Sequence, residues 1–282
     1  MNELATPQSV VVGIDGSKAA IRAALWAVDE AVSRDAPLRL LYATEQAGTA
    51  EREPAAAEAA IRHAIKAIQA AGKPVRIETE VAQGPAIGSL ISMSASAAMV
   101  CVGAVGLRHF RPGRVGSTAA ALATSARCPV AIIRSRDDNL HRPADGIVVE
   151  LDGSPDNGVL LGAAAEEARL RNAAIRAIIC RRTAPEDNGP ATMRPAEGDR
   201  RALADLDRRL ARWKRRYPDL RVESVAVHGG LLEYLASSRG SVGLVIVGAR
   251  NRQHLTELAG PAGSAVLQDA DCSLLVVNQQ HL

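Results

Sequence analysis

Residues 100–133 read VCVGAVGLRHFRPGRVGSTAAALATSARCPVAII, and this stretch constrains the fold and the function more than any other. An apolar run leads into a glycine-punctuated loop, a helix start at Ser117, and a second apolar run. Gly103, Gly106 and Gly116 allow the backbone of the loop to approach a ligand where side chains would collide. A helix beginning at Ser117 would direct free amide groups and the positive end of its dipole into that loop. The stretch therefore favours binding of an anion, most simply a phosphate.

The chain repeats this plan, which indicates a duplication. The stretch VVVGIDGSKAAIRAALWAVDEA from Val10 resembles IVVELDGSPDNGVLLGAAAEEA from Ile147, and an Asp-Gly-Ser triplet follows the apolar run in both. Self-similarity over half the length indicates two copies of one unit. The total of 282 residues suits two domains of ordinary size. We therefore expect one domain over residues 1–137 and a second over residues 145–282.

Apolar runs alternate with helical stretches in both halves. In the first half we expect strands at residues 10–14, 38–42, 75–81, 99–102 and 130–133, and helices at 19–33, 51–71, 87–95 and 117–126. In the second half we expect strands at 147–151, 174–179, 222–227, 244–247 and 274–277, a helix at 200–217 and an irregular surface loop at 181–198. Continuous apolar strands between helices predict an α/β fold whose parallel sheets are covered on both faces.

Composition narrows the classes of partner. Hydrophobic residues make up 47% of the chain, charged residues 23%, and the formal net charge is +3, so nothing demands an acidic partner. Aromatic residues are only 2%, which leaves no platform for stacking bases and argues against nucleic acid. The arginine-rich stretch 200–217 carries its leucines on one stripe, as expected of a core-facing helix with a solvated outer face.

The N-terminal residues lack the pattern of a signal peptide, and the most apolar window, 90–105, is too interrupted to span a membrane. We expect a cytoplasmic protein that binds no membrane.

Asp15 is the second candidate site residue, because it directly follows the first expected strand. In parallel sheets, ligands collect at the carboxyl ends of the strands where the winding order reverses. If the first and fourth strands are neighbours, Asp15 and the glycine loop share one edge. A nucleotide suits both: phosphates at the loop, and a ribose, a base or a magnesium-bound water near Asp15. The alternative is that Asp15 only stabilises the turn at Gly16 and Ser17.

These residues together resemble the nucleotide-binding pattern of the universal stress protein family. The pattern consists of Gly103, Gly106 after two further residues, and Gly116 after nine more, followed by Ser117. A Gly-Ile-Asp-Gly-Ser segment precedes it at the first strand. The resemblance covers nearly the whole chain, and the duplication is similar to the tandem members of the family. It implies two tandem Rossmann-like domains, each a five-stranded parallel sheet with helices on both faces, with ATP bound in motif-bearing members.

Carried over position by position, the resemblance implies ATP and Mg²⁺ as cofactors. Asp15 would lie near the ribose and hold Mg²⁺, directly or through water, while the backbone of Ala43 would meet the adenine. The ribose and phosphates would be surrounded by Gly103, Gly106, Gly116, Ser117 and Thr118. Family members commonly dimerise through the last strand, which implies a homo-oligomer or an internal pseudo-dimer. The residues alone do not separate ATP from ADP, AMP or a cyclic nucleotide.

The loop between Gly106 and Gly116 is basic. Arg111 and Arg114 could fold over the phosphates and donate charge-assisted hydrogen bonds, which makes them candidate binding residues. The alternative is a solvated basic loop without a binding role.

The second copy departs from the motif. Asn251 stands at the position of Gly106, and the next Gly-Ser pair, Gly263-Ser264, lies two residues later than expected. Gly260-Pro261 alters the path of the intervening loop. We therefore expect weak nucleotide binding or none in the second domain.

No recognisable catalytic pattern is present, so we assign no catalytic residues and expect at most weak ATP hydrolysis. The favoured function is an ATP-binding stress regulator that switches conformation or its interaction with an unidentified protein partner. One alternative is a nucleotide-independent dimeric scaffold in which the motif is only a turn. Another is a slow ATPase of a related adenine-nucleotide-binding fold.

Overall fold

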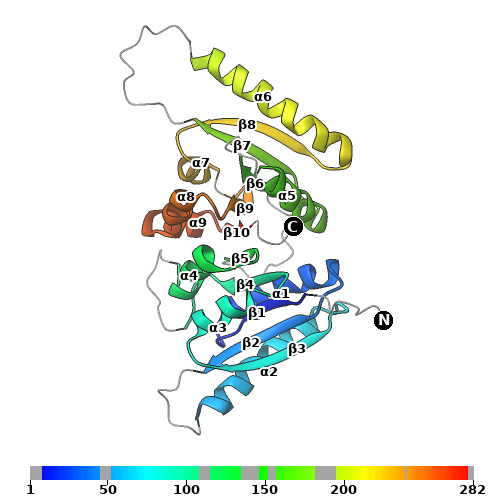
Figure 1. Cartoon of the computed structure of the whole chain (residues 1–282), viewed down its shortest axis with the longest axis vertical. Coiled ribbons are helices and arrows are strands. Elements are labelled where there is room, and N and C mark those ends of the chain that lie inside the picture. The colour runs from blue at the N-terminus through cyan, green and yellow to red at the C-terminus, as the bar shows by residue number, and fades with distance from the viewer. Residues whose placement is uncertain are drawn as a thin grey trace.

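The computed structural model describes residues 8–44, 52–107, 115–134, 146–151, 157–181, 195–238 and 240–278. Over these ranges the chain forms a ten-stranded sheet with helices on both faces (Figure 1). Each half supplies five strands that are parallel to one another. The predicted α/β class with five parallel strands per half is confirmed.

The first half alternates strands and helices in the order that the sequence predicts. Its strands are β1 (Val10–Gly13), β2 (Leu38–Thr44), β3 (Ile77–Gln83), β4 (Met99–Gly103) and β5 (Val130–Ile133). Its helices are α1 (Lys18–Ser33), α2 (Arg52–Ala70), α3 (Ala86–Met93) and α4 (Ser117–Ser125). Helix α1 begins where the Ser17 hydroxyl accepts a hydrogen bond from the Ala20 amide, so Ser17 is its N-cap.

The second half repeats this order and adds a helix near its end. Its strands are β6 (Gly146–Glu150), β7 (Ile175–Arg181), β8 (Val222–His228), β9 (Val242–Gly248) and β10 (Ser273–Val277). Its helices are α5 (Asn157–Arg171), α6 (Pro195–Arg216), α7 (Leu231–Ser237), α8 (Arg252–Ala259) and α9 (Pro261–Asp269).

Two expectations for the second half need correction. The irregular loop expected at 181–198 is shorter, because β7 extends through Arg181 and α6 already begins at Pro195. A proline has no amide hydrogen and a fixed φ, so it is well suited to the first turn of a helix. The stretch between Gly248 and Gly260, read from the sequence as a loop, contains helix α8.

The strand order places the first and fourth strands of each half side by side. Across the whole sheet the order is β3-β2-β1-β4-β5-β10-β9-β6-β7-β8. In the first half β1 pairs in parallel with β2 on one side and β4 on the other. The winding order therefore reverses between β1 and β4, and their carboxyl ends form the edge where ligands collect in such sheets.

Both faces of the sheet are buried. In β1, Val10 and Val12 pack under α1 and α2, whereas Val11 packs with α3 and α4 on the other face. All three side chains have no exposed surface. In the second half α5 and α6 lie on the face of α1, and α7, α8 and α9 lie on the face of α4. This explains why the inner strands β1, β4, β5 and β9 are apolar throughout, whereas the edge strand β3 carries polar residues such as Thr79 and Glu80 at exposed positions.

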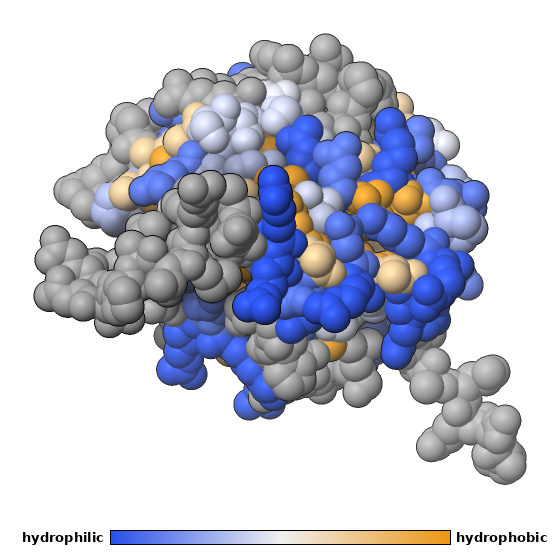
Figure 2. All heavy atoms as spheres, turned by 90° about the horizontal axis from the view of Figure 1, so that it is seen from above, coloured by the Kyte–Doolittle hydropathy of each residue, from blue (hydrophilic) through white to orange (hydrophobic). Residues whose placement is uncertain are grey.

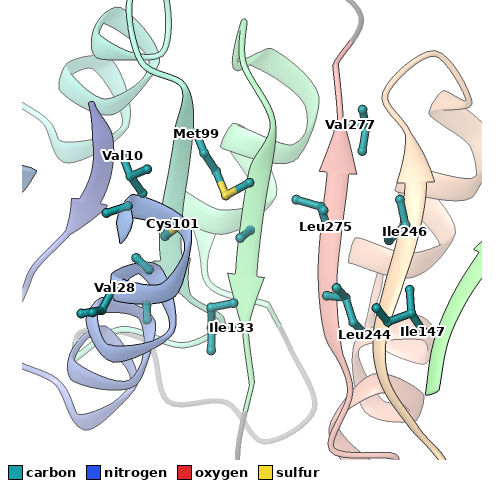
Figure 3. Close-up of a cluster of buried hydrophobic side chains, with 14 of the residues drawn as sticks. Val10, Val28, Met99, Cys101, Ile133, Ile147, Leu244, Ile246, Leu275 and Val277 are labelled. Atoms are coloured by element: carbon teal, nitrogen blue, oxygen red, sulfur yellow. The ribbon is translucent and has the colours of Figure 1, made fainter. Parts of the chain in front are cut away.

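The two halves meet along their last strands. Strand β5 pairs antiparallel with β10, with Ile132 opposite Leu274 and Val130 opposite Val276. The hydrophobic core continues across this seam, with Ile133 and Leu275 on its two sides (Figure 3). The ten strands therefore form one sheet with a continuous core.

Helix α6 covers one end of the sheet and has the predicted orientation. Leu206 and Leu210 are buried against β7 and β8, whereas Arg208, Arg209 and other arginines are exposed. Seen from this end, the described surface is mainly hydrophilic (Figure 2).

Within the described part of the chain, no helix combines the length and the apolar character needed to cross a bilayer.

Candidate functional site

Asp15 lies at the edge between β1 and β4 and holds two separate segments of backbone. Its Oδ1 accepts a hydrogen bond of 2.9 Å from the amide of Ser17, at the start of α1. Its Oδ2 accepts one of 3.0 Å from the amide of Leu107, in the glycine loop after β4. The first contact is the turn role weighed from the sequence, and the second ties Asp15 to the loop. Each carboxylate oxygen has a further lone pair with which it can meet a ligand.

Gly106 is a glycine because of its contact with Asp15. A Cβ atom at position 106 would lie 2.7 Å from Oδ2 of Asp15, closer than real Cβ contacts allow. Any side chain there would push the carboxylate away or open the loop. The close approach that the sequence predicts for this glycine is therefore made, in this structure, by Asp15.

Gly103 has a packing role. A Cβ atom at position 103 would lie 2.7 Å from both the carbonyl carbon and the Cβ of Ala19, in the first turn of α1. The absence of a side chain thus lets α1 approach the end of β4. This contact positions the start of α1, and with it Asp15, against the glycine loop.

Gly116 closes the loop and precedes α4. Its amide donates a 2.8 Å hydrogen bond to the carbonyl of Ala104, and it is the N-cap residue of the helix. No side chain in the described ranges caps the first turn, and Ser117 is exposed. A Cβ atom at position 116 would lie 3.7 Å from the amide nitrogen of Gly106, so both ends of the loop lie together. The first-turn amides of α4 and the Asp15 carboxylate thus border one edge of the sheet.

Ala43 lies on the neighbouring strand with its backbone toward the same edge. The carbonyl of Leu41 accepts a 2.8 Å hydrogen bond from Ile14, where the pairing between β1 and β2 ends. Backbone groups alternate sides along a strand, so those of Ala43, two residues further on, also point to the side of β1. They lie beyond the last paired residue of β1, at the level of Asp15.

The fold thus brings most of the sequence-predicted residues to one edge: Asp15, Gly103, Gly106, Gly116, Ser117 and Thr118, with Ala43 on the adjacent strand. Arg111 and Arg114 lie outside the described residues. Leu107 is a contributor that sequence reasoning missed. Its amide donates to Asp15, and the residue is 65% exposed beside this edge. The one sequence feature that could have indicated this role is the position of Leu107 directly after Gly106.

A metal at this edge would have few protein ligands. Among the described residues, no group of three or more His, Cys, Asp or Glu side chains could hold a metal ion. Asp15 is the carboxylate available here, and one carboxylate suits Mg²⁺ that keeps its waters and binds phosphate oxygens. The residues present therefore fit a nucleotide-bound Mg²⁺ better than an all-protein metal site.

Comparison with known proteins settles the family. The sequence matches the Universal stress protein family twice, over residues 7–134 and 144–278. The chain belongs to the universal stress protein family. It is a tandem member, as the internal repeat predicts, and the family gives it a role in the stress response.

Full-length relatives support this assignment. A universal stress protein of Mycobacterium tuberculosis is 55% identical over 289 residues, which cover 100% of both chains. Another from the same organism is 42% identical over 273 residues, covering 95% of this chain and 97% of the relative. The solved structure of a universal stress protein from Archaeoglobus fulgidus has a TM-score of 0.70 at 14% identity and covers 97% of each chain. The last similarity concerns the fold alone.

In the second universal stress protein domain, helix α8 lies between the fourth strand, β9, and helix α9. Asn251, at the position of Gly106, caps α8 by accepting a 3.2 Å hydrogen bond from the amide of His254. The Nδ1 of His254 lies 2.7 Å from Oε2 of Glu150, at the carboxyl end of β6. Leu255 and Leu258 bury the apolar side of the helix. In this domain, side chains of α8 therefore occupy the carboxyl end of β6.

The residue of the second domain that corresponds to Gly116 is not Gly263, as the sequence suggested, but Gly260. Gly263-Ser264 lies one turn inside α9, and the N-cap of α9 is Gly260. A Cβ atom at Gly263 would lie 2.6 Å from Cα of Leu258, so this glycine serves the packing of α9 against α8. Pro261 occupies the first helical position, where it supplies no amide hydrogen. The second domain thus offers fewer first-turn donors than the first.

Proposed function

We propose that this universal stress protein binds an adenine nucleotide, with ATP and Mg²⁺ as the expected form, at the β1–β4 edge of its first domain. Binding would favour one arrangement of the glycine loop and alter contacts with a protein partner or a second copy of the chain, within the cytoplasm. The observation that carries the proposal is that the first-turn amides of α4, which no described side chain caps, and the Asp15 carboxylate lie at one edge. Neither feature alone would suffice.

The charges at this edge complement the two parts of a nucleotide. Backbone amides at a helix start and the positive end of its dipole stabilise phosphate. A carboxylate accepts hydrogen bonds from ribose hydroxyls, and the spare lone pairs of Asp15 are available for them. The backbone groups of Ala43 can pair with an adenine edge on the same side of the sheet. When bound, Mg²⁺ would neutralise phosphate charge, and Asp15 would hold it directly or through a water molecule.

One nucleotide per chain is the expected stoichiometry. In the second domain, Pro261 removes one amide hydrogen, and His254 on α8 pairs with Glu150 at the matching edge. These contacts support the expectation that the second domain binds nucleotide weakly or not at all.

Two alternatives remain distinct in their measurable behaviour. A nucleotide-independent dimeric scaffold would have the same melting temperature and oligomeric state with and without ATP. A slow ATPase of a related fold would release phosphate at a rate that falls in Asp15→Ala.

The proposal is tested by thermal unfolding with and without Mg-ATP. Nucleotide at about 100 times its Kd should raise the Tm of the wild-type chain by roughly 5–10 °C. Gly116→Ala should fold normally, because its Cβ would make only ordinary contacts of 3.5 Å or more, yet it would cover the Gly106 amide and remove the rise.

Gly88→Ala is the matched control, since a Cβ there meets nothing within 4 Å. It should retain the full shift. Absence of a shift in the wild-type chain would refute nucleotide binding and favour the scaffold. An equal shift in Gly116→Ala would show that the nucleotide binds elsewhere.

A further inference from the structure

Two glutamates are buried at the seam between the domains, on helices α1 and α5. Glu30 and Glu167 occupy matching positions in the two copies, each twenty residues after the repeats begin at Val10 and Ile147. Their side chains are only 1% and 2% exposed. Buried carboxylates at an interface are rare unless each has a cationic partner.

A single guanidinium, that of Arg171, serves both carboxylates, and its side chain is 17% exposed. Arg171 on α5 donates from Nη2 to Oε1 of Glu30 at 2.6 Å and from Nε to Oε2 of Glu167 at 2.8 Å. The indole ring of Trp26, on α1, lies 4.1 Å from the guanidinium carbon of Arg171. Arg171 therefore joins the two domains through an ion pair and a cation–π contact at once.

The other charged groups at this seam lie nearer to solvent. Arg34 is 32% exposed and lies 3.2 Å from Glu30 and 3.7 Å from Glu166, which is itself 68% exposed. Solvent screens these outer charges more strongly than the inner three. One further titratable group, the Cys101 thiol, lies on β4 in the sheet that α1 covers. Burial raises its pKa most, and the charges of Glu30 and then Glu167 raise it further, so the thiol stays neutral.

Arg171 thus faces two carboxylates that are almost fully buried, and of these two the second cation, Arg34, contacts only Glu30 and from a more exposed position. Burial, followed by the negative charge of Glu30, raises the pKa of Glu167 from its ordinary 4.5 to about 7, although Arg171 opposes this. Two carboxylates that share a site cannot both ionise without repulsion. With one proton on the pair, the charge of the remaining carboxylate balances that of Arg171.

We propose that the seam binds one proton at the Glu30–Glu167 pair, so that α1 docks on α5 most stably in mildly acidic solution and less stably in alkaline solution. The proton comes from solvent and resides on a carboxylate oxygen to which Arg171 does not donate, while Arg171 keeps its hydrogen bonds to both carboxylates. This inference does not depend on nucleotide binding, because the pair lies at the far end of α1 from Asp15. It makes the contact between the domains sensitive to pH near neutrality.

The sign of the pH effect follows from the direction of the shift. A carboxyl group whose pKa is higher in the folded chain stabilises it at low pH, and this contribution is lost as pH rises through about 7. Glu167→Gln is neutral at every pH and mimics the protonated carboxyl group. Between pH 6 and pH 8 the Tm of the wild-type chain should fall by about 2–4 °C more than that of Glu167→Gln.

Glu166→Gln is the control, since it removes an exposed charge from the neighbouring position and should behave as wild type. If Glu167→Gln yields no folded protein, Glu30→Gln removes a charge from the same pair and should flatten the pH dependence in the same way. The proposal is overturned if the folded variant keeps the wild-type pH dependence, or if it is less stable than wild type at pH 8.

Trp26 supplies a local readout, because only two tryptophans are present and the other is Trp213 on α6. In a Trp213→Phe background, Trp26 emission should titrate with a midpoint near pH 7, and Glu167→Gln should abolish the titration. An ion pair with only a structural role would leave this emission constant. Constant emission in the Trp213→Phe chain would therefore count against the proposal.

Discussion

At the scale of single residues, the candidate site depends on one carboxylate and the glycine opposite it. Asp15 accepts backbone hydrogen bonds from Ser17 and from Leu107, and Gly106 leaves the space that its Oδ2 occupies. Asp15 therefore links the start of α1 to the backbone that follows β4. The hydrogen bond to Ser17 is the turn role expected from the sequence, and contact of the same carboxylate with a ribose hydroxyl or a hydrated Mg²⁺ stays a prediction.

The residue-scale prediction concerns Arg111 and Arg114. Both lie between Leu107 and Val115, which flank the site, and a guanidinium that meets a phosphate forms a charge-assisted hydrogen bond worth about 1.5–3 kcal/mol. We expect Arg111→Ala and Arg114→Ala together to weaken ATP binding at least ~10-fold and AMP binding less. Titration calorimetry measures both affinities.

Arg127→Ala serves as the control, because Arg127 is exposed beyond the opposite end of α4. It should leave both affinities unchanged. If the double variant binds ATP as tightly as wild type, the arginines are solvated loop residues, which is the second interpretation of this segment.

At the scale of helices and strands, sequence patterns predicted the sheet well and the irregular parts less well. The strands were predictable because both faces are covered, so runs such as Val10–Gly13 are apolar throughout. Helix α8 was missed because its stretch is short and polar, and a Gly-Pro pair follows it. Its signals were the capping residue Asn251 and the buried pair Leu255 and Leu258, spaced three apart.

The glycines show why a site is harder to predict than a strand. From the sequence, Gly103, Gly106 and Gly116 share one explanation, namely close approach of a ligand. In the structure Gly103 accommodates Ala19, Gly106 accommodates Asp15, and Gly116 has room for a methyl group. These differences depend on contacts between segments far apart in the chain, which spacing along the sequence does not encode.

The prediction at this scale compares Gly103→Ala with Gly248→Ala, two matching positions at the ends of β4 and β9. At position 103 the added methyl group would overlap Ala19 at 2.7 Å, and forcing α1 outward should destabilise the chain by about 1–3 kcal/mol. At position 248 the nearest atom is 3.7 Å away, so the change should stay within about 0.5 kcal/mol. Urea denaturation measures both. Equal effects would show that the close contact between α1 and β4 is not required for stability.

At the scale of the whole molecule, two domains of the same fold share one sheet but differ at the edge where a ligand would bind. The last strands pair antiparallel, and Arg134 and Asn278, which follow them, each bind the other half. Arg134 donates to Oγ of Ser264 at 3.0 Å, and Asn278 donates to the carbonyl of Ala126 at 2.5 Å. Burial lowers the pKa of Arg134 to about 10, so it remains charged near neutral pH. In the first copy, no described side chain caps the first-turn amides of α4 beside Asp15, whereas in the second copy side chains of α8 occupy the matching edge.

This asymmetry makes the number of nucleotides bound per chain the most direct test of the account. Isothermal titration of the full-length chain with Mg-ATP should give one site per chain, and Gly116→Ala should eliminate it. Two equivalent sites, or no binding by the wild-type chain, would contradict the proposed division between a nucleotide-binding first domain and a closed second domain.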